Sequence, residues 1–138
     1  MNIRKTLSTI ALAGAFITIS AVPLAAGPDS PRLIEVVADK DNTFKVVGQS
    51  KPVITVKPGE KIVLKITSYF GGEKGRDGSL HSFVVKKLRD QGWDIRLMEG
   101  TKEYPLAAPQ QEGEYLVECT VKCGRGHDDM NMKLIVKK

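Results

Sequence analysis

The stretch Ile62-Val-Leu-Lys-Ile-Thr67 decides the fold class of this chain. Its side chains Ile62, Leu64 and Ile66 recur at every second position, so in an extended backbone they share one face while the lysine and the threonine point to the other. A period of two is typical of a β-strand with one buried face. The stretch therefore predicts a strand that lies on a hydrophobic core.

Further short strands are expected on both sides of this one. Together they cover residues 33–38, 43–47, 53–56, 61–68, 80–86, 114–119 and 132–137. Pro58-Gly59 and Gly113 punctuate them, as turns require. No long helical period competes with this pattern. The sequence therefore predicts one all-β domain of about 110 residues, built as a β-sandwich.

The densest chemistry of the chain lies in the twelve-residue stretch Cys-Thr-Val-Lys-Cys-Gly-Arg-Gly-His-Asp-Asp-Met, which contains Cys119, Cys123, His127 and Met130. The two cysteines are the only ones in the chain. Thiolates with imidazole select copper, zinc or iron–sulfur centres, and a thioether favours copper. A disulfide would close only a short loop, would stabilise the fold weakly and would leave the histidine and the methionine without a role. Zinc is an alternative that leaves only Met130 unexplained.

His81 is the only other histidine besides His127. It lies near the start of the apolar run Leu80-His-Ser-Phe-Val-Val85, which follows the glycine-rich residues 69–78. A histidine at the point where a loop feeds a buried strand is held rigidly, and its ring can point into a site that another loop builds. We expect His81 to be a metal ligand, because precise metal sites draw ligands from rigid strand ends.

The pattern Cys119-x-x-x-Cys123-x-x-x-His127-x-x-Met130, preceded by a strand that contains His81-Ser-Phe, resembles the binuclear copper centre called CuA. This centre occurs in subunit II of haem–copper oxidases and in nitrous oxide reductase. The resemblance is strong over residues 80–85 and 119–130 and looser over residues 33–138. It implies a cupredoxin-like Greek-key β-sandwich, with one ligand on a strand and the others on the loop that joins the last two strands.

The resemblance also assigns roles. Two copper ions would be bridged by both cysteine thiolates and capped by one histidine each, with the methionine as a weak axial ligand and a backbone carbonyl as the sixth donor. The metal ligands would be His81, Cys119, Val121, Cys123, His127 and Met130. Because protein donors fill every position, we expect an electron carrier and not an enzyme. Its partners would be redox proteins, such as a cytochrome or a terminal reductase or oxidase, with no small-molecule substrate.

The chain departs from the oxidase subunit in two ways: it has at most one hydrophobic segment, and no tryptophan comes just before the strand that starts at His81. Two other readings therefore stay open. One is a copper chaperone or storage protein, and the other is a mononuclear cupredoxin or a zinc-binding structural module. The acidic pair Asp128-Asp129 beside His127 should favour an oxidised copper state.

The first 26 residues have the features of a secretory signal. A basic start with Arg4 and Lys5 precedes an uncharged run to Ala26, and small residues precede Gly27 as a cleavage site requires. An uncleaved membrane anchor is the alternative. In either case residues 27–138 would form the exported copper domain, periplasmic in a bacterium. Loss of the two cations would reduce the formal charge from +5 to +3.

The remaining features point to no other function. Lysines and arginines are scattered among acidic residues, so nucleic-acid binding is not expected. Residues 69–78 lack the setting of a phosphate-binding loop, so we expect a connector in which Tyr69 and Phe70 either contact a redox partner or join the core. Residues 87–112 are expected to wrap across one end of the sandwich, with Trp93 in the core.

Overall fold

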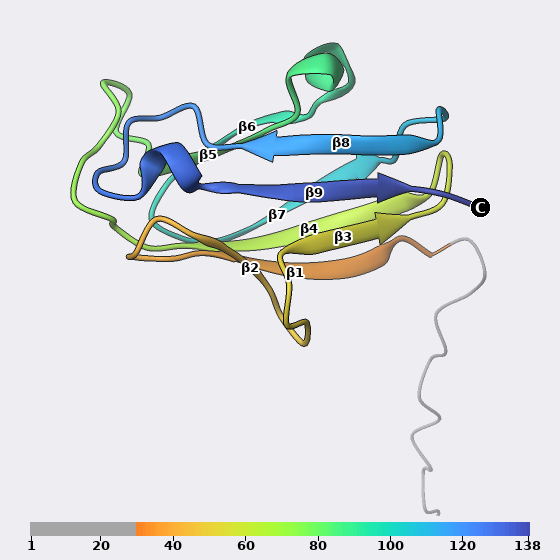
Figure 1. Ribbon diagram of the computed structural model, residues 1–138, viewed down its shortest axis with the longest axis horizontal. Helices are drawn as coiled ribbons and strands as arrows, with labels where there is room; N and C mark the ends of the chain where they lie inside the picture. Colours follow the sequence, from red (N-terminus) through yellow and green to blue (C-terminus); the bar gives the residue numbers. More distant parts are fainter. Residues whose placement is uncertain (1–29) are drawn as a thin grey trace, which may run out of the picture.

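The computed structural model describes residues 30–138, which form two β-sheets packed face to face (Figure 1). One sheet has the strand order β2-β1-β4-β7 and the other β3-β9-β8-β5-β6. The strands are β1 (Arg32–Ala38), β2 (Phe44–Val46), β3 (Val53–Val56), β4 (Lys61–Ser68), β5 (His81–Val84), β6 (Asp94–Leu97), β7 (Gly100–Ala107), β8 (Gly113–Glu118) and β9 (Asn131–Val136). Two short 3-10 helices, η1 (Lys86–Gln91) and η2 (His127–Asp129), lie between strands.

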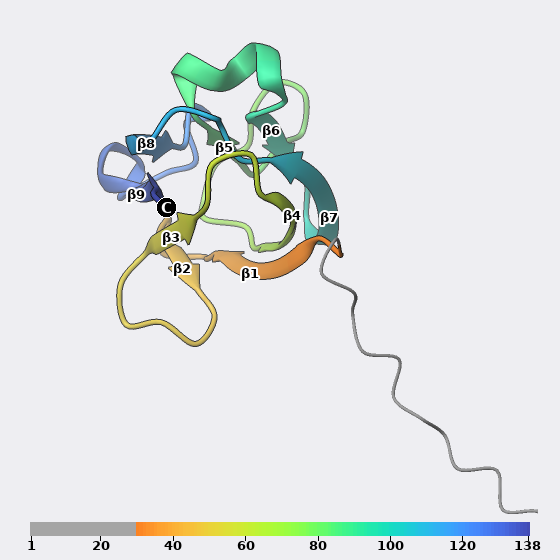
Figure 2. The same ribbon diagram turned by 90° about the vertical axis from the view of Figure 1, so that its right-hand side faces the viewer.

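Alternation of side chains explains how the two layers meet. Ile62, Leu64 and Ile66 of β4 are all buried, as the period of two predicts. Strands β1 and β4 run parallel, as do β3 and β9, while the other pairs are antiparallel. Figure 2, which shows the molecule from its right-hand side in Figure 1, displays the two layers with the core between them. The predicted all-β sandwich is therefore confirmed.

An aromatic cluster links the two sheets near the middle of the core. The ring of Phe83 in β5 meets that of Phe44 in β2 edge to face, with centroids 5.5 Å apart, and lies 6.5 Å from that of Trp93. Trp93 is fully buried and its indole N–H donates a hydrogen bond to the carbonyl of Ala107. Its predicted place in the core is confirmed.

Residues 87–112 differ from the expectation. They contain η1 and two strands, β6 and β7, each at an edge of its sheet. β7 pairs with β4 along its whole length, from Lys61 opposite Ala107 to Ser68 opposite Gly100. The prediction of a segment that only wraps across one end was wrong, because an exposed edge strand carries little of the apolar alternation that reveals strands in a sequence.

Four segments meet at one end of the sandwich, on the left in Figure 1. They are the turn between β1 and β2, the loop that follows β4, the start of β5 and the loop from β8 to β9 with η2. The cysteines and histidines lie here. Within residues 30–138, no helix has the length and apolar character needed to cross a membrane. The expected signal, residues 1–26, lies outside the described part of the chain.

Candidate metal centre

His81 enters the site from the first position of β5 and is fully buried. Because side chains alternate along a strand, its ring lies on the same face as Phe83, which packs on Phe44 of the opposite sheet. The ring therefore points into the interior at the loop end of the sandwich. This is the strand position that the sequence predicted for it.

The two ring nitrogens of His81 have different environments. Nε2 lies 2.7 Å from the carbonyl oxygen of Tyr69, and since a carbonyl only accepts hydrogen bonds, Nε2 carries the proton. Nδ1 is buried and has no hydrogen-bond partner among the described residues. In a neutral ring this nitrogen presents a bare lone pair, which is the state of a metal-ligating histidine whose other nitrogen is fixed by a carbonyl.

The sulfur atoms lie beside this histidine. Both cysteines are free thiols, with Sγ of Cys119 3.8 Å from Sγ of Cys123, and the latter is 3.7 Å from Sδ of Met130. The ligand atoms of His81, Cys119 and Cys123 all lie within 4.8 Å of one another. Three sulfurs and a bare imidazole nitrogen thus converge in a buried volume, which fits a soft metal ion.

Two further expected donors reach the same cluster. The carbonyl oxygen of Val121 lies 3.3 Å from Sγ of Cys119, and Nδ1 of His127 lies 3.5 Å from Sγ of Cys123. His127 belongs to η2, is only half-buried and stands outside the tight group of three ligand atoms. The structure therefore brings all six predicted donors to one place, with His127 on the solvent side.

The two thiols differ in acidity. Burial raises the pKa of Cys119, but the nearby ring of His81 and the hydrogen bond from the backbone N–H of Ser82 outweigh it and lower the pKa to about 6. Burial, and then the charge of the neighbouring Cys119 thiolate, raise the pKa of Cys123. One thiolate thus forms readily near neutral pH, and a metal ion that binds it must displace the proton from the second.

The backbone of the β8–β9 loop is shaped to hold these donors. The N–H of Cys119 donates to the carbonyl of Met130, which closes the loop at its base. Gly124 and Gly126 adopt φ of 121° and 91°, which favour glycine. The hydroxyl of Ser82 accepts from the N–H of Thr120 at 2.7 Å and so ties β5 to the residue after Cys119.

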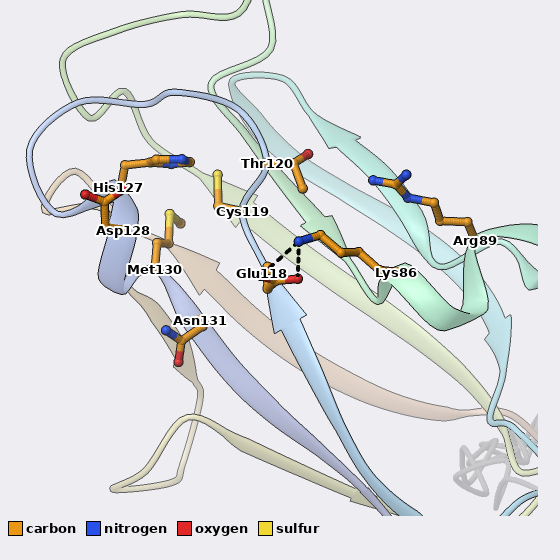
Figure 3. A pocket seen from close by; sticks show the side chains of 9 residues that line it. All are labelled: Lys86, Arg89, Glu118, Cys119, Thr120, His127, Asp128, Met130 and Asn131. Atoms are coloured by element: carbon orange, nitrogen blue, oxygen red, sulfur yellow. Dashed lines mark hydrogen bonds and ion pairs between the residues drawn. The ribbon is translucent and has the colours of Figure 1, made fainter.

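One side of the cluster faces a surface hollow of about 490 Å³, shown in Figure 3. Cys119, His127 and Met130 line it at one side, and the ion pair between Lys86 and Glu118, 3.1 Å long, at the other. The donor set therefore lies just under the surface, with the sulfur atoms largely shielded.

The sulfur geometry fits a metal. Two sulfurs bonded to a common ion at about 2.3 Å with a tetrahedral angle stand about 3.8 Å apart, which is the separation of the two thiols. This distance holds for one ion bound by both cysteines and for two ions that share them. The histidine, the two cysteines and Met130 thus fit either a mononuclear or a binuclear copper site.

The sequence predicted candidate donors that the structure brings together, but it gave no indication of the groups that orient them. The carbonyl of Tyr69 sets the tautomer of His81, and Ser82 touches both Cys119 and Thr120. A backbone carbonyl has no side-chain signature, so the first contact leaves no trace in the sequence. Ser82 had one clue, since it directly follows a ligand histidine.

Comparisons with known proteins bear on the fold. No protein-family model and no curated protein matches the chain. Among solved structures, a haem–copper terminal oxidase dimer matches with a TM-score of 0.57 and 17% identity over 88% of this chain and 78% of the other. The periplasmic domain of subunit II of cytochrome oxidase (CoxB) from Bradyrhizobium japonicum matches with a TM-score of 0.51 and 16% identity, over 78% and 84%.

A copper-containing nitrite reductase from Thermus scotoductus SA-01 also matches, with a TM-score of 0.51 and 22% identity, over 86% of this chain but 25% of its own. At such low identities these likenesses concern the fold alone. The chain has the cupredoxin fold, and its loop end carries a His-Cys-Cys-Met donor set.

Proposed function

We propose that the chain is an exported electron-transfer protein with a binuclear CuA-type copper centre. Its ligands would be His81, Cys119, Val121 through its carbonyl, Cys123, His127 and Met130. One observation carries the proposal: the buried Nδ1 of His81 has no partner in the described chain and lies beside two free thiols. A buried polar atom left unpaired costs free energy, and a metal ion would satisfy it.

The donor types favour copper. Thiolates and imidazole alone suit zinc equally well, but zinc sites close with four donors and have no need of a thioether. Met130 is fully buried with Sδ 3.7 Å from Sγ of Cys123. A long, weak axial methionine is typical of copper electron-transfer sites.

The number of donors favours two ions. Six donor atoms converge. His81 and the carbonyl of Val121 lie beside Cys119, and His127 and Met130 lie beside Cys123. A single ion with four donors would leave two of them without a role. The tight group formed by His81, Cys119 and Cys123 favours the mononuclear alternative, in which Met130 completes the set and His127 remains outside.

Each part of the proposed copper site would make its own contribution to electron transfer. Bound copper would supply a one-electron couple. The two thiolates offset the positive charge, and the buried surroundings limit rearrangement of solvent when an electron arrives. In the proposed centre, protein donors would fill every metal position, which supports a carrier that exchanges electrons with a redox protein, such as a cytochrome or a terminal reductase or oxidase, and not an enzyme.

Export is the second part of the proposal. Residues 1–26 have the charge pattern of a secretory signal, and free thiols in an exported protein survive when a metal protects them. The mass of the protein recovered from the host tests this directly. We expect a chain that starts at Gly27, whereas a chain that retains residues 1–26 in the membrane fraction would indicate an anchor.

A reductive titration combined with a metal count tests the function. The proposal predicts two coppers per chain that take up one electron together and return it to an added oxidant without loss of metal. One copper per electron would support the mononuclear cupredoxin. Copper that leaves in variable amounts on reduction would support a chaperone or storage protein instead.

A further inference from the structure

A single buried side-chain amide joins the loop that leads to His81 and the loop that contains His127. Asn42 lies in the turn between β1 and β2 and is 1% exposed. Its Nδ2 donates to the carbonyl of Gly71 at 3.0 Å and to the carbonyl of Arg125 at 2.6 Å. Gly71 belongs to the loop after β4 and Arg125 to the β8–β9 loop, so one side chain links two segments that are far apart in the sequence.

The positions of these carbonyls relate directly to the ligands. Gly71 comes two residues after Tyr69, whose carbonyl fixes the ring of His81. Arg125 comes two residues before His127. Asn42 therefore spans the supports of both histidines.

The surrounding backbone is built around this amide. A Cβ at Gly71 would lie 1.8 Å from Oδ1 of Asn42, and a Cβ at Gly124 would lie 2.7 Å from the carbonyl oxygen of Gly71. The N–H of Glu73 also donates to the carbonyl of Cys123. The two loops can approach this closely only because glycines stand at both contact points.

The backbone of the turn adopts a less favourable conformation at Asn42. Asn42 is the one non-glycine residue with positive φ within residues 30–138, at 58°. Asparagine adopts this conformation more easily than most residues, but it remains less favourable than ordinary turn geometry. Strain of this kind persists where the surrounding structure requires it, and it is frequent next to functional sites.

From these contacts we propose that Asn42 is a positioning residue that fixes the separation of the two histidine ligands. Its hydrogen bonds go to backbone carbonyls and not to a proposed metal donor. It acts through Gly71 on the support of His81 and through Arg125 on η2, which carries His127. The effect on bound copper rests on the proposed function, whereas the effect on the metal-free loop does not.

Two substitutions remove the link in different ways. Asn42→Asp keeps the shape and the tolerance of positive φ but loses both donors and turns a carboxylate toward two carbonyls. Asn42→Gly removes the amide and adopts φ of 58° without strain. Val46→Ala is the matched control, because Val46 is buried in the adjacent strand β2 and its loss lowers stability without touching either loop.

The first readout is amide hydrogen exchange in the metal-free protein. The N–H groups of His127, Asp129 and Met130 all donate within the β8–β9 loop. In Asn42→Asp and Asn42→Gly we expect these groups to exchange about tenfold faster, which corresponds to about 1.4 kcal/mol and lies within the range for the loss of two such hydrogen bonds. Exchange equal to that of Val46→Ala at matched global stability would overturn the proposal.

The second readout is release of copper(I) from the loaded protein to a chelator such as bathocuproine disulfonate. Both Asn42 variants should release copper about tenfold faster than Val46→Ala, and equal rates would contradict the assignment. If the unsubstituted protein takes up no copper, the proposed function fails, and the exchange experiment on the metal-free chain still decides the role of Asn42.

A double substitution tests the contact itself. Gly71→Ala should disturb the loop in the natural chain, because its new methyl group meets the amide of Asn42. In the Asn42→Gly background the methyl group has room, so the double variant should exchange no faster than Asn42→Gly alone. Effects of the two substitutions that add independently would show that Gly71 and Asn42 do not act together.

Discussion

At the scale of single residues, the surroundings of His81 would prepare it as a ligand before a metal ion binds. The carbonyl of Tyr69 holds the proton on Nε2, and burial keeps water from the bare Nδ1. A ring fixed in this way has little freedom to lose when it binds. The free energy left unsatisfied at Nδ1 becomes part of the affinity for the metal.

Met130 is the residue that best separates copper from zinc. Met130→Leu conserves volume and should change the free energy of unfolding of the metal-free protein by less than about 1.5 kcal/mol. In the copper-loaded protein it removes a sulfur lone pair that stabilises the more positive oxidised state, so the reduction potential should rise by roughly tens of millivolts. Protein-film voltammetry measures the shift.

The control for this substitution is zinc affinity, which should stay the same in Met130→Leu because four-donor zinc sites need no thioether. A potential unchanged by the substitution would show that Met130 is only a core residue.

The acidic pair Asp128 and Asp129 gives a second residue-scale prediction. Both side chains are exposed on η2, next to His127. Two negative charges near a redox centre favour its oxidised state, so replacing both by asparagine should raise the reduction potential by roughly tens of millivolts at low salt, and less at high salt. Glu112→Gln, an exposed acid in the connection between β7 and β8, serves as the control. A lower or unchanged potential in the double variant would refute this prediction.

Candidate ligands could be proposed from the sequence because their chemistry is in their side chains. Cys119, Cys123, His127 and Met130 are close along the chain, and His81 stood out as the only other histidine. Asn42 could not be found in this way. Its partners are the backbone carbonyls of Gly71 and Arg125, and the second lies 83 positions away in the sequence.

At the scale of elements, the strands that could be predicted from the sequence are those with one buried face. Ile62, Leu64 and Ile66 of β4 alternate cleanly, so residues 61–68 were predicted with the bounds that the structure has. β7 is an edge strand whose residues are mostly exposed, and Pro105 lies within it. Proline is tolerated there because one side of an edge strand has no partner, yet its presence lowers any strand signal.

Trp93 anchors residues 87–112, whose strands were not predicted, in the hydrophobic core. Trp93→Phe should lower the free energy of unfolding by about 1 to 3 kcal/mol, because it leaves a void and deprives the carbonyl of Ala107 of its hydrogen bond. Urea unfolding followed by circular dichroism measures this loss. A change under about 0.5 kcal/mol would mean that the ring contributes little to the core.

Asp39 stabilises the turn that presents Asn42. Burial opposes its charge, but the ion pair with Lys45 and hydrogen bonds from Thr43 and Asp41 outweigh it and hold its pKa below the ordinary value of 3.8. The unfolded chain therefore takes up a proton at higher pH than the folded chain. The stabilisation is complete above about pH 4 and is lost as the pH falls below it.

This linkage predicts a difference between acid titrations. The melting temperature of the natural chain should fall more between about pH 5 and pH 3 than that of Asp39→Asn, which lacks the titrating group. Differential scanning calorimetry of the metal-free proteins makes the comparison. Equal losses in the two proteins would mean that other carboxylates govern the acid response.

At the scale of the whole molecule, the two sheets act as a rigid frame for loops gathered at one end. His81 is fixed by β5, the β8–β9 loop is closed at its base by Cys119 and Met130, and the turn after β1 inserts Asn42 between the loops. In the proposed electron carrier, such a frame would limit movement of the ligands when an electron arrives. Substrate turnover would need an open metal position, which the donor set does not favour.

The central claim is that two copper ions share the thiolates of Cys119 and Cys123, and the electron paramagnetic resonance spectrum of the oxidised, copper-loaded protein tests it most directly. The proposal predicts two coppers per chain with one unpaired electron shared by both, seen as a seven-line hyperfine pattern. A four-line pattern from one copper, or a silent protein loaded with zinc, would contradict it.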